Sequence, residues 1–253
     1  MAAVATAVQN ADAAIIFSDT FSGTGNLNGT VPDDRPGTET WTSRTTEPIP
    51  TVGSGTANVA FTGSSYLAWT PSSGAIYSLS VDMKSSGTTT ATSTFAGFGF
   101  FNSGASTTTT YAGSSSTTPW AFIRTGNISA GSIGDVVVRP LGSSGNDINT
   151  NYTVTNTIKL ELILNTTDTD VVTNGDQWSL MFLVNGVQIG TTTTYNEADS
   201  TALLNGIKRI GLTNATDSNA VTYDNFVLQT IPEPSAAAVL SGGLGLLALR
   251  RRK

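Results

Sequence analysis

The sequence predicts an all-β fold, a two-sheet antiparallel β-sandwich of jelly-roll type followed by a short hydrophobic helix at the C-terminus. Three observations predict it: several segments alternate apolar and polar residues, turn-forming residues separate them, and only 12% of the 253 residues are charged. Abundant Thr suits strands because its branched side chain packs on a pleated surface, while Gly, Asn and Ser suit turns. The length fits one domain, since β-sandwiches reach roughly 200–250 residues.

Three segments show the strand pattern most clearly. Residues 75–84 place Tyr77 and every second residue after it on one face, with polar residues on the other. Residues 158–164 repeat this pattern, and so do residues 176–184. The third segment runs into Asn185-Gly186, the favoured pair for a type I′ hairpin turn, so a return strand should begin at Val187 with that side chain facing inward.

The remaining strands are shorter, and we expect no amphipathic helix between residues 14 and 230. They are predicted at residues 15–21, 58–61, 66–69, 95–101, 120–124, 136–139, 207–213 and 222–228. The Thr/Ser/Gly-rich stretches 85–94 and 103–118 are interpreted as surface loops. The sandwich domain therefore covers residues 14–230.

The chain contains neither His nor Cys. Disulfides, Cys-based zinc sites and His-based acid–base chemistry are therefore excluded. Residues 14–230 contain 16 acidic and 8 basic residues, a net charge of −8. An acidic surface repels phosphate backbones, so we expect no nucleic-acid partner and favour cations, neutral glycans or other matrix components.

Glycoside hydrolysis needs two carboxylates that flank the scissile bond. The four Glu residues of the domain, Glu39, Glu47, Glu161 and Glu197, are isolated from one another in the sequence. No acid–base pair is visible, so the sequence predicts that the protein is not an enzyme.

One loop has the composition of a calcium site. Asp168, Asp170, Asn174 and Asp176 alternate carboxylates and an amide between two predicted strands, and such oxygen ligands suit Ca²⁺. The alternative is a polar loop in which these residues cap turns. Residues 33–34 form a second acidic loop and a weaker candidate.

Two tryptophans are candidates for glycan contact. Trp41 follows a charged loop and Trp120 a Thr/Ser-rich loop, which makes both candidates for exposed rings that stack on sugars. The alternative is that they plug the ends of the sandwich. Trp69 and Trp178 lie within predicted strands and are expected in the core.

The C-terminus has three parts in a fixed order. Pro232-Glu233-Pro234 precedes an apolar run whose 15 residues (235–249) fall short of the roughly 20 that span a bilayer as a helix. A basic cluster ends the chain and should remain cytoplasmic. It consists of Arg250, Arg251, Arg252 and Lys253.

This tail closely resembles the PEP-CTERM sorting signal of exported Gram-negative bacterial proteins. The resemblance implies transient anchoring in the inner membrane and cleavage near the Pro-Glu-Pro motif by an exosortase-type membrane protease. The alternative is an ordinary single-pass tail anchor. At the other end, residues 1–13 are Ala-rich and close on Ala11-Asp12-Ala13, which indicates the remnant of a secretion signal; the alternative is a disordered leader.

The domain itself resembles concanavalin-like, laminin-G-like jelly rolls. The residues that carry the resemblance are Asp19-Thr20-Phe21-Ser22-Gly23, Trp41 and Tyr223-Asp224-Asn225-Phe226. It implies that the first and last strands lie side by side. Together with the tail, it predicts an exported structural or adhesive protein of the bacterial envelope or exopolysaccharide matrix. The alternative is a carbohydrate-binding or glycan-processing module.

Overall fold

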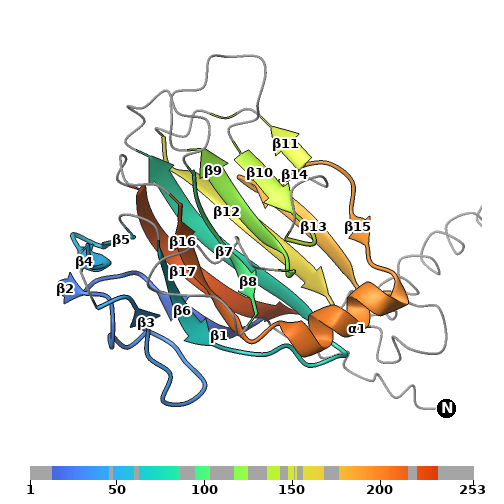
Figure 1. The fold of residues 1–253 in the computed structure, drawn as a ribbon, viewed down its shortest axis with the longest axis horizontal. Coiled ribbons are helices and arrows are strands. Elements are labelled where there is room, and N and C mark those ends of the chain that lie inside the picture. The colour runs from blue at the N-terminus through green and yellow to red at the C-terminus, as the bar shows by residue number, and fades with distance from the viewer. Residues whose placement is uncertain are drawn as a thin grey trace, which may run out of the picture.

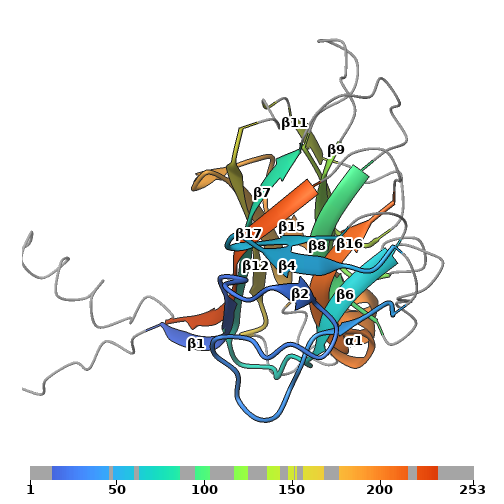
Figure 2. The same cartoon turned by 90° about the vertical axis from the view of Figure 1, so that its left-hand side faces the viewer.

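The computed structural model describes residues 13–45, 48–59, 63–85, 95–102, 117–124, 136–142, 148–150, 152, 156–167, 177–215 and 221–232. Within them the chain forms two antiparallel sheets that pack face to face, as Figures 1 and 2 show. The predicted two-sheet β-sandwich is therefore confirmed. The predicted C-terminal helix lies outside the described residues.

The larger sheet, sheet A, has ten strands. They are β1 (Ala14–Asp19), β2 (Gly25–Asn26), β4 (Thr51–Gly53), β5 (Thr56–Asn58), β7 (Ile76–Ser85), β12 (Ile158–Asn165), β13 (Ser179–Val184), β14 (Val187–Gln188), β15 (Thr193–Thr194) and β17 (Val221–Ile231). Their order is β14-β13-β12-β7-β17-β5-β4-β2, with β1 beside β17 and β15 beside β13. The long strands β7, β12 and β17 thus form its centre.

The smaller sheet, sheet B, has seven strands. They are β3 (Thr42–Ser43), β6 (Gly63–Ala68), β8 (Phe95–Phe101), β9 (Trp120–Arg124), β10 (Val136–Arg139), β11 (Ile148–Thr150) and β16 (Arg209–Asn214). Their order is β11-β10-β9-β8-β16-β6-β3, which puts β8 in the middle. The observed bounds of β8, β9 and β10 are the predicted ones.

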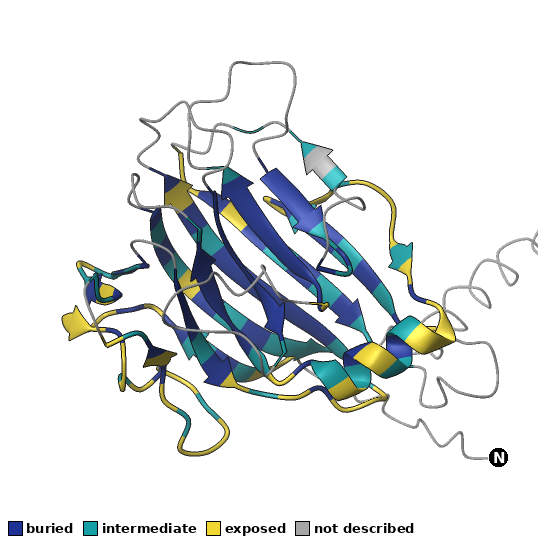
Figure 3. Ribbon diagram, viewed as in Figure 1, coloured by how far each residue is buried: buried dark blue, intermediate teal, exposed yellow. Residues whose placement is uncertain are grey.

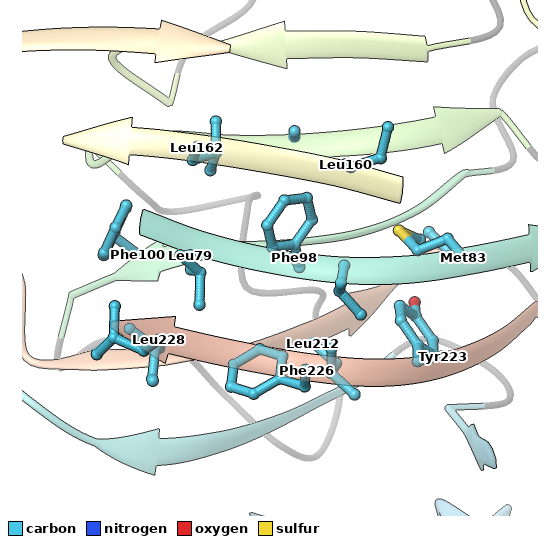
Figure 4. Packing of buried hydrophobic residues seen from close by; sticks show 14 of the residues in the cluster. Leu79, Met83, Phe98, Phe100, Leu160, Leu162, Leu212, Tyr223, Phe226 and Leu228 are labelled. Atoms are coloured by element: carbon cyan, nitrogen blue, oxygen red, sulfur yellow. The ribbon is translucent and has the colours of Figure 1, made fainter. Parts of the chain in front are cut away.

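The main core lies between the sheets, where the alternating apolar residues meet. In sheet A, Leu79 of β7 pairs in register with Leu162 of β12 and, on its other side, with Leu228 of β17. Phe98 and Leu212 of sheet B face them across the core (Figure 4). Figure 3 shows that both sheets are mostly buried. Burial of this apolar surface drives the pairing of the layers.

The first and last strands pair, as the resemblance to concanavalin-like domains implied. Ala14 lies opposite Thr230, and Asp19 lies opposite Phe226. Figure 2 shows β1 and the end of β17 side by side. The pairing of β17 with β7 is interrupted by a bulge between Asp224 and Val227, which β17 accommodates with a positive φ of 49° at Asn225.

The Asn185-Gly186 hairpin is confirmed. Asn185 and Gly186 have φ values of 51° and 79°, the two positive values of a type I′ turn. Val184 pairs with Val187, so the register is the predicted one. Val187 therefore shares a face with the buried Val184, as predicted, but its side chain is 60% exposed because β14 is an edge strand.

The sequence predicted no amphipathic helix between residues 14 and 230, and the helix described there is only weakly amphipathic. Helix α1 (Glu197–Gly206) lies across the lower ends of the strands in Figure 1. Its only fully buried side chains are those of Ser200 and Leu203, so the sequence lacks the broad apolar stripe that predicts a helix. The Asn196 side chain caps it by accepting a hydrogen bond from the Asp199 backbone N–H at 2.8 Å. Among the residues described, no helix has the length and apolar character needed to cross a membrane.

Candidate functional site

The two tryptophans predicted to contact glycans are both buried. Trp41 is 1% exposed and Trp120 is 0% exposed, so neither ring is available as an open platform for a sugar. The interpretation of these residues as exposed was therefore wrong, and the plug alternative describes Trp41 better. Trp178 is buried as expected, and Trp69 is partly buried against Tyr77 and Phe100.

Trp41 contacts residues of both other motifs on which the resemblance to concanavalin-like domains rests. Its indole N–H donates to the Asp19 carboxylate at 2.7 Å, and the other oxygen of that carboxylate accepts from the Phe21 backbone N–H at 2.7 Å. The Trp41 ring lies 5.8 Å from the ring of Phe21 and 5.2 Å from that of Phe226. Segments far apart in sequence therefore form one structural corner.

A cavity of about 160 Å³ opens beside this corner. Asp19 and Asp33 line it together with small and apolar residues. Burial raises the pKa of the Asp19 carboxyl above its ordinary value, the hydrogen bonds from Trp41 and Phe21 oppose the rise, and the charge of Asp33 adds to it. The cavity thus contains two carboxylates and no basic group among its lining residues.

The carboxylates of the 33–34 loop are used as local hydrogen-bond acceptors. Asp33 accepts from the backbone N–H and the hydroxyl of Thr20 at 2.8 and 2.7 Å, and Asp34 accepts from the Ser18 hydroxyl at 2.6 Å. In the described part of the chain, no group of three or more acidic side chains is placed to hold a metal ion. These two carboxylates thus connect the loop to Ser18 and Thr20, at and just after the end of β1, rather than cap a turn within the loop.

Several predicted site residues lie outside the described residues. They are the calcium candidates Asp168, Asp170, Asn174 and Asp176, the motif residues Glu233 and Pro234, and the basic cluster Arg250, Arg251, Arg252 and Lys253. Pro232 is the last residue described. Calcium binding at residues 168–176 therefore stays a prediction.

The outer face of sheet B, which points away from the core, is rich in aromatic rings. On β8, Phe98 and Phe100 enter the core, whereas Phe95 and Phe101 point the opposite way and form a second apolar cluster with Trp120 and Phe122. The Phe95 ring lies 4.8 Å from Phe122, and the Trp120 ring lies 4.7 Å from Phe122. This second cluster has an exposed fraction of 9% or less at every ring.

Three arginines lie over aromatic rings on the same face. The Arg139 guanidinium is 5.4 Å from the Trp120 ring centre and 5.1 Å from that of Phe122. The Arg209 guanidinium is 3.9 Å from the ring centre of Tyr66, and Arg124 is 5.5 Å from Phe122. We call this set the arginine–aromatic face. It comprises Tyr66, Phe95, Phe101, Trp120, Phe122, Arg124, Arg139 and Arg209.

Glycines allow the strands beneath these side chains to approach closely. Gly99 pairs with Trp120 on one side and with Gly211 on the other, and Gly211 pairs with Tyr66. A Cβ at Gly99 would lie 2.6 Å from the Trp120 Cα, and one at Gly211 would lie 2.7 Å from the Tyr66 Cα. Only glycine fits these positions without moving the backbone.

The charge of this face is one-sided. The seven strands of sheet B contain Arg124, Arg139 and Arg209 and no Asp or Glu. The strands of sheet A contain four acidic residues, Asp19, Asp82, Glu161 and Asp224, and two lysines. Glu161 accepts a hydrogen bond from the Ser78 hydroxyl, so it has no acid–base partner in that contact. Within the described strands, the charged residues of sheet B are thus all basic in an otherwise acidic chain.

Sequence reasoning missed this face although a signal was present. Trp120, Phe122 and Arg124 alternate along one predicted strand, so they had to share a face. The other side of that strand is also apolar, with Ala121 and Ile123 in the core, and the pattern alone therefore did not show which face pointed outward.

No protein-family model matches the sequence, and no curated protein matches it. An endo-1,3-beta-glucanase from Streptomyces sioyaensis has a similar structure, with 11% identity, a TM-score of 0.52, and coverage of 91% of this chain and 100% of that chain. An engineered GH43 glycoside hydrolase with endo-xylanase and exo-arabinofuranosidase activity has 12% identity and a TM-score of 0.52, covering 91% of this chain and 42% of that one.

The potassium-bound carbohydrate recognition domain of Emp46p is 15% identical, with a TM-score of 0.44 and coverage of 75% of this chain and 87% of that chain. The two glycoside hydrolases, at such low identity, show a shared fold alone. The chain therefore has a concanavalin-like β-sandwich fold, and a fold shared by lectins and hydrolases does not by itself determine a function.

Proposed function

We propose that this domain binds carbohydrate without cleaving it, through the arginine–aromatic face. The observation that carries the proposal is the set of three guanidinium groups stacked on aromatic rings along one side of sheet B. Tyr66, Arg139 and Arg209 are half-buried, so these side chains reach solvent above the buried rings. Tyr66 supplies the half-buried ring of this face, and an aromatic ring with a polar tip offers both an apolar surface and a hydrogen-bonding group.

A binding role is favoured over hydrolysis by the distribution of carboxylates. Hydrolysis of a glycosidic bond uses two carboxyl groups roughly 5–9.5 Å apart. The described strands of sheet B contain no Asp or Glu, and Asp33 and Asp34 are engaged by Thr20 and Ser18. This supports the reading of the arginine–aromatic face as a binding surface.

The C-terminal tail supports a proposal about location. We infer that the protein is exported and sorted to the bacterial surface or exopolysaccharide matrix through the Pro232-Glu233-Pro234 motif, with an exosortase-type membrane protease as its processing partner. In the native host, a tagged protein should then lose the segment after this motif. Deletion of residues 231–253 should release a cell-associated protein into the medium, and a tail that persists equally without exosortase would contradict sorting.

The binding proposal is tested with the purified full-length chain and a panel of soluble polysaccharides. We expect retarded migration in gels that contain a bound polysaccharide, with affinity near the millimolar range per site, about 4 kcal/mol. Incubation with the same polysaccharides should release no reducing ends. Tyr66→Ala should weaken binding because it removes the ring beneath Arg209, whereas Val187→Ala, on the exposed edge of sheet A, should not.

Sustained release of reducing ends that a carboxylate substitution abolishes would overturn the non-catalytic proposal. Equal binding by the Tyr66→Ala and parent proteins, with folding confirmed by thermal melting, would move the site away from the arginine–aromatic face.

A further inference from the structure

The outer face of sheet A, on the side away from the core, carries a row of apolar side chains. Ile163 of β12 lies opposite Met181 of β13, and both are half-buried. Val227 of β17 is half-buried on the same face, because its neighbours Phe226 and Leu228 enter the core. These three side chains belong to neither of the buried clusters that the described residues form.

Two serines of β7 lie between these apolar side chains. Ser78 lies opposite Ile163, and Ser80 lies opposite Val227. Their side chains point away from the core, yet Ser78 is 1% and Ser80 is 5% exposed because larger side chains flank them on both neighbouring strands. We call this set the serine–apolar face. It comprises Ser78, Ser80, Ile163, Met181 and Val227.

One end of this face carries two carboxylates that repel each other. Asp82 of β7 lies directly opposite Asp224 of β17, and like charges at opposed positions of neighbouring strands destabilise a sheet. The Asn225 side-chain amide donates to Asp82 at 2.9 Å. Lys84 and Lys159, both at exposed positions, offset part of the charge. A further cationic group beside the two aspartates would relieve their repulsion.

The C-terminal segment of the chain begins at the other end of this face. Ile231, the last residue of β17, lies opposite Ile76, the first residue of β7. Pro232 follows it, and a proline cannot donate to a sheet ladder. Connections of roughly 2–6 residues join strands to helices, and Ser235 is of a type that favours the start of a helix. A helix from Ala236 onward can therefore begin beside Ile76 and run back along β7.

The length of the apolar segment matches the length of the face. From Ile76 to Asp82, strand β7 extends about 20 Å. As a helix, residues 236–249 measure about 21 Å. A segment that starts beside Ile76 therefore brings the basic cluster, residues 250–253, to Asp82 and Asp224.

We propose that the serine–apolar face is a docking site for residues 235–253 of the same chain when these residues are not in a membrane. The apolar run lies along the two serines, where it is shielded from water, and the basic cluster lies beside the paired aspartates. Gly242, Gly243 and Gly245 weaken a free helix, so packing on the sheet has to stabilise it. This inference goes beyond glycan binding and does not rest on it.

The dimensions favour this occupant over a second copy of the chain. The face extends over three strand spacings from β13 to β17, about 14 Å, and about 20 Å along β7. Its area is therefore about 300 Å², whereas a stable interface buries roughly 800 Å² on each partner. A helix about 10 Å wide fits within it. The described strands of sheet B repel the basic cluster, because their charged residues are all arginines.

The test places one spin label on the tail of the full-length chain. The sequence has no Cys, so Ser241→Cys provides a single attachment site. Docking predicts paramagnetic broadening of the backbone amide signals of β7, β12 and β17 around Ser78 and Ser80, while the signals of β10 in sheet B stay sharp. Equal broadening throughout the domain, or none in sheet A, would overturn the proposal.

A mixing experiment identifies the occupant. Spin-labelled chain without isotopes is added to isotopically labelled chain without the spin label, so that any broadening comes from another molecule. We expect none at Ser78 and Ser80. Broadening there in the mixture would show that a second copy occupies the face and would overturn docking within one chain.

Matched variants separate the two parts of the contact. Arg250→Glu with Arg251→Glu places negative charges beside Asp82 and Asp224 and should abolish the broadening at β7, whereas Arg250→Lys with Arg251→Lys should retain it. These tail substitutions leave the contacts of the described domain intact. Equal broadening in both pairs would overturn the assignment of the basic cluster to the aspartates.

A substitution on the face tests the apolar part. Ser80→Lys puts a long charged side chain into the apolar row and should abolish the broadening, while Val187→Lys, at an exposed position on the edge of sheet A, should not. If Ser80→Lys does not fold in a thermal melt, the tail variants still decide. Polysaccharide binding is measured separately by gel retardation, so loss of docking with binding retained overturns this inference alone.

Discussion

At the scale of single residues, Asp19 joins the end of β1 to two aromatic residues, Phe21 and Trp41, and no sequence pattern predicted these contacts. Its buried carboxylate accepts hydrogen bonds from the Trp41 indole and from the Phe21 backbone, and Phe21 has a positive φ of 51°. A positive φ is unfavourable for a bulky residue and persists only where neighbouring contacts hold it. Asp19 therefore fixes both a strained backbone position and the orientation of Trp41.

Asp19→Asn should destabilise the protein. The Asn side chain has one acceptor oxygen and a donor amide, so one of the two N–H donors, from Trp41 or Phe21, loses its acceptor inside the protein. We expect a loss of roughly 1–3 kcal/mol in the free energy of unfolding, measured by urea denaturation. Asp34→Asn is the matched control at an exposed position, and equal effects for the two would contradict this account of the corner.

The same residue should make stability depend on pH. Because burial raises the pKa of folded Asp19 above its ordinary value, the folded state takes up a proton at higher pH than the unfolded state does. Between those two pKa values the contribution of Asp19 to the free energy of unfolding therefore increases as the pH falls. Subtracting the profile of Asp19→Asn from that of the parent should isolate this increase, and a flat difference would contradict it.

Gly99 tests the close approach of strands under the arginine–aromatic face. Gly99→Ala places a Cβ 2.7 Å from the Pro119 carbonyl oxygen as well as against Trp120, so β8 and β9 must separate. The expected cost is roughly 1–3 kcal/mol by thermal or urea unfolding. Gly53→Ala in β4 is the control, since no atom lies within 4 Å of its added Cβ, and a similar cost there would show that strand glycines matter for another reason.

At the scale of elements, long strands with one apolar and one polar face were predictable from the sequence. Strands of two residues were not, and neither was the orientation of strands that are apolar on both faces. Strand β12 alternates because every second side chain is buried in the core and those between are partly or fully exposed. Strands β2, β3 and β15 contain two residues each, too few for any periodicity. Strands β8 and β10 are apolar on both sides, so their existence was predictable but their orientation depends on pairing with distant segments.

Helix α1 shows which signal was available and overlooked. Its periodicity is weak, but Asn196 followed by Glu197 and Asp199 is a helix start with a capping side chain and first-turn acidic residues. Asn196→Ala should cost about 1 kcal/mol of stability because the Asp199 N–H loses its partner. Asn205→Ala, at an exposed position of the same helix, is the control; if it costs as much in chemical denaturation, the cap explanation fails.

At the scale of the whole molecule, average composition concealed the division of charge between layers. A net charge of −8 over residues 14–230 predicted an acidic surface, yet sheet B is the exception to that average. Charge segregation depends on which strands join which sheet, and non-local pairings such as β8 with β16 decide that. Net charge therefore described the chain correctly but did not show that the arginines of the described strands all lie in sheet B.

The most direct test of the central claim is to map the ligand on the folded protein. Backbone amide shifts of the full-length chain are recorded by NMR during titration with oligomers of a polysaccharide that retards the protein in gels. The account predicts shifts concentrated in β9, β10 and β16 around Arg139 and Arg209 and at Tyr66, with the solvent face of β7 and β12 unchanged. Shifts confined to sheet A, or to the cavity beside Asp19 and Asp33, would contradict it.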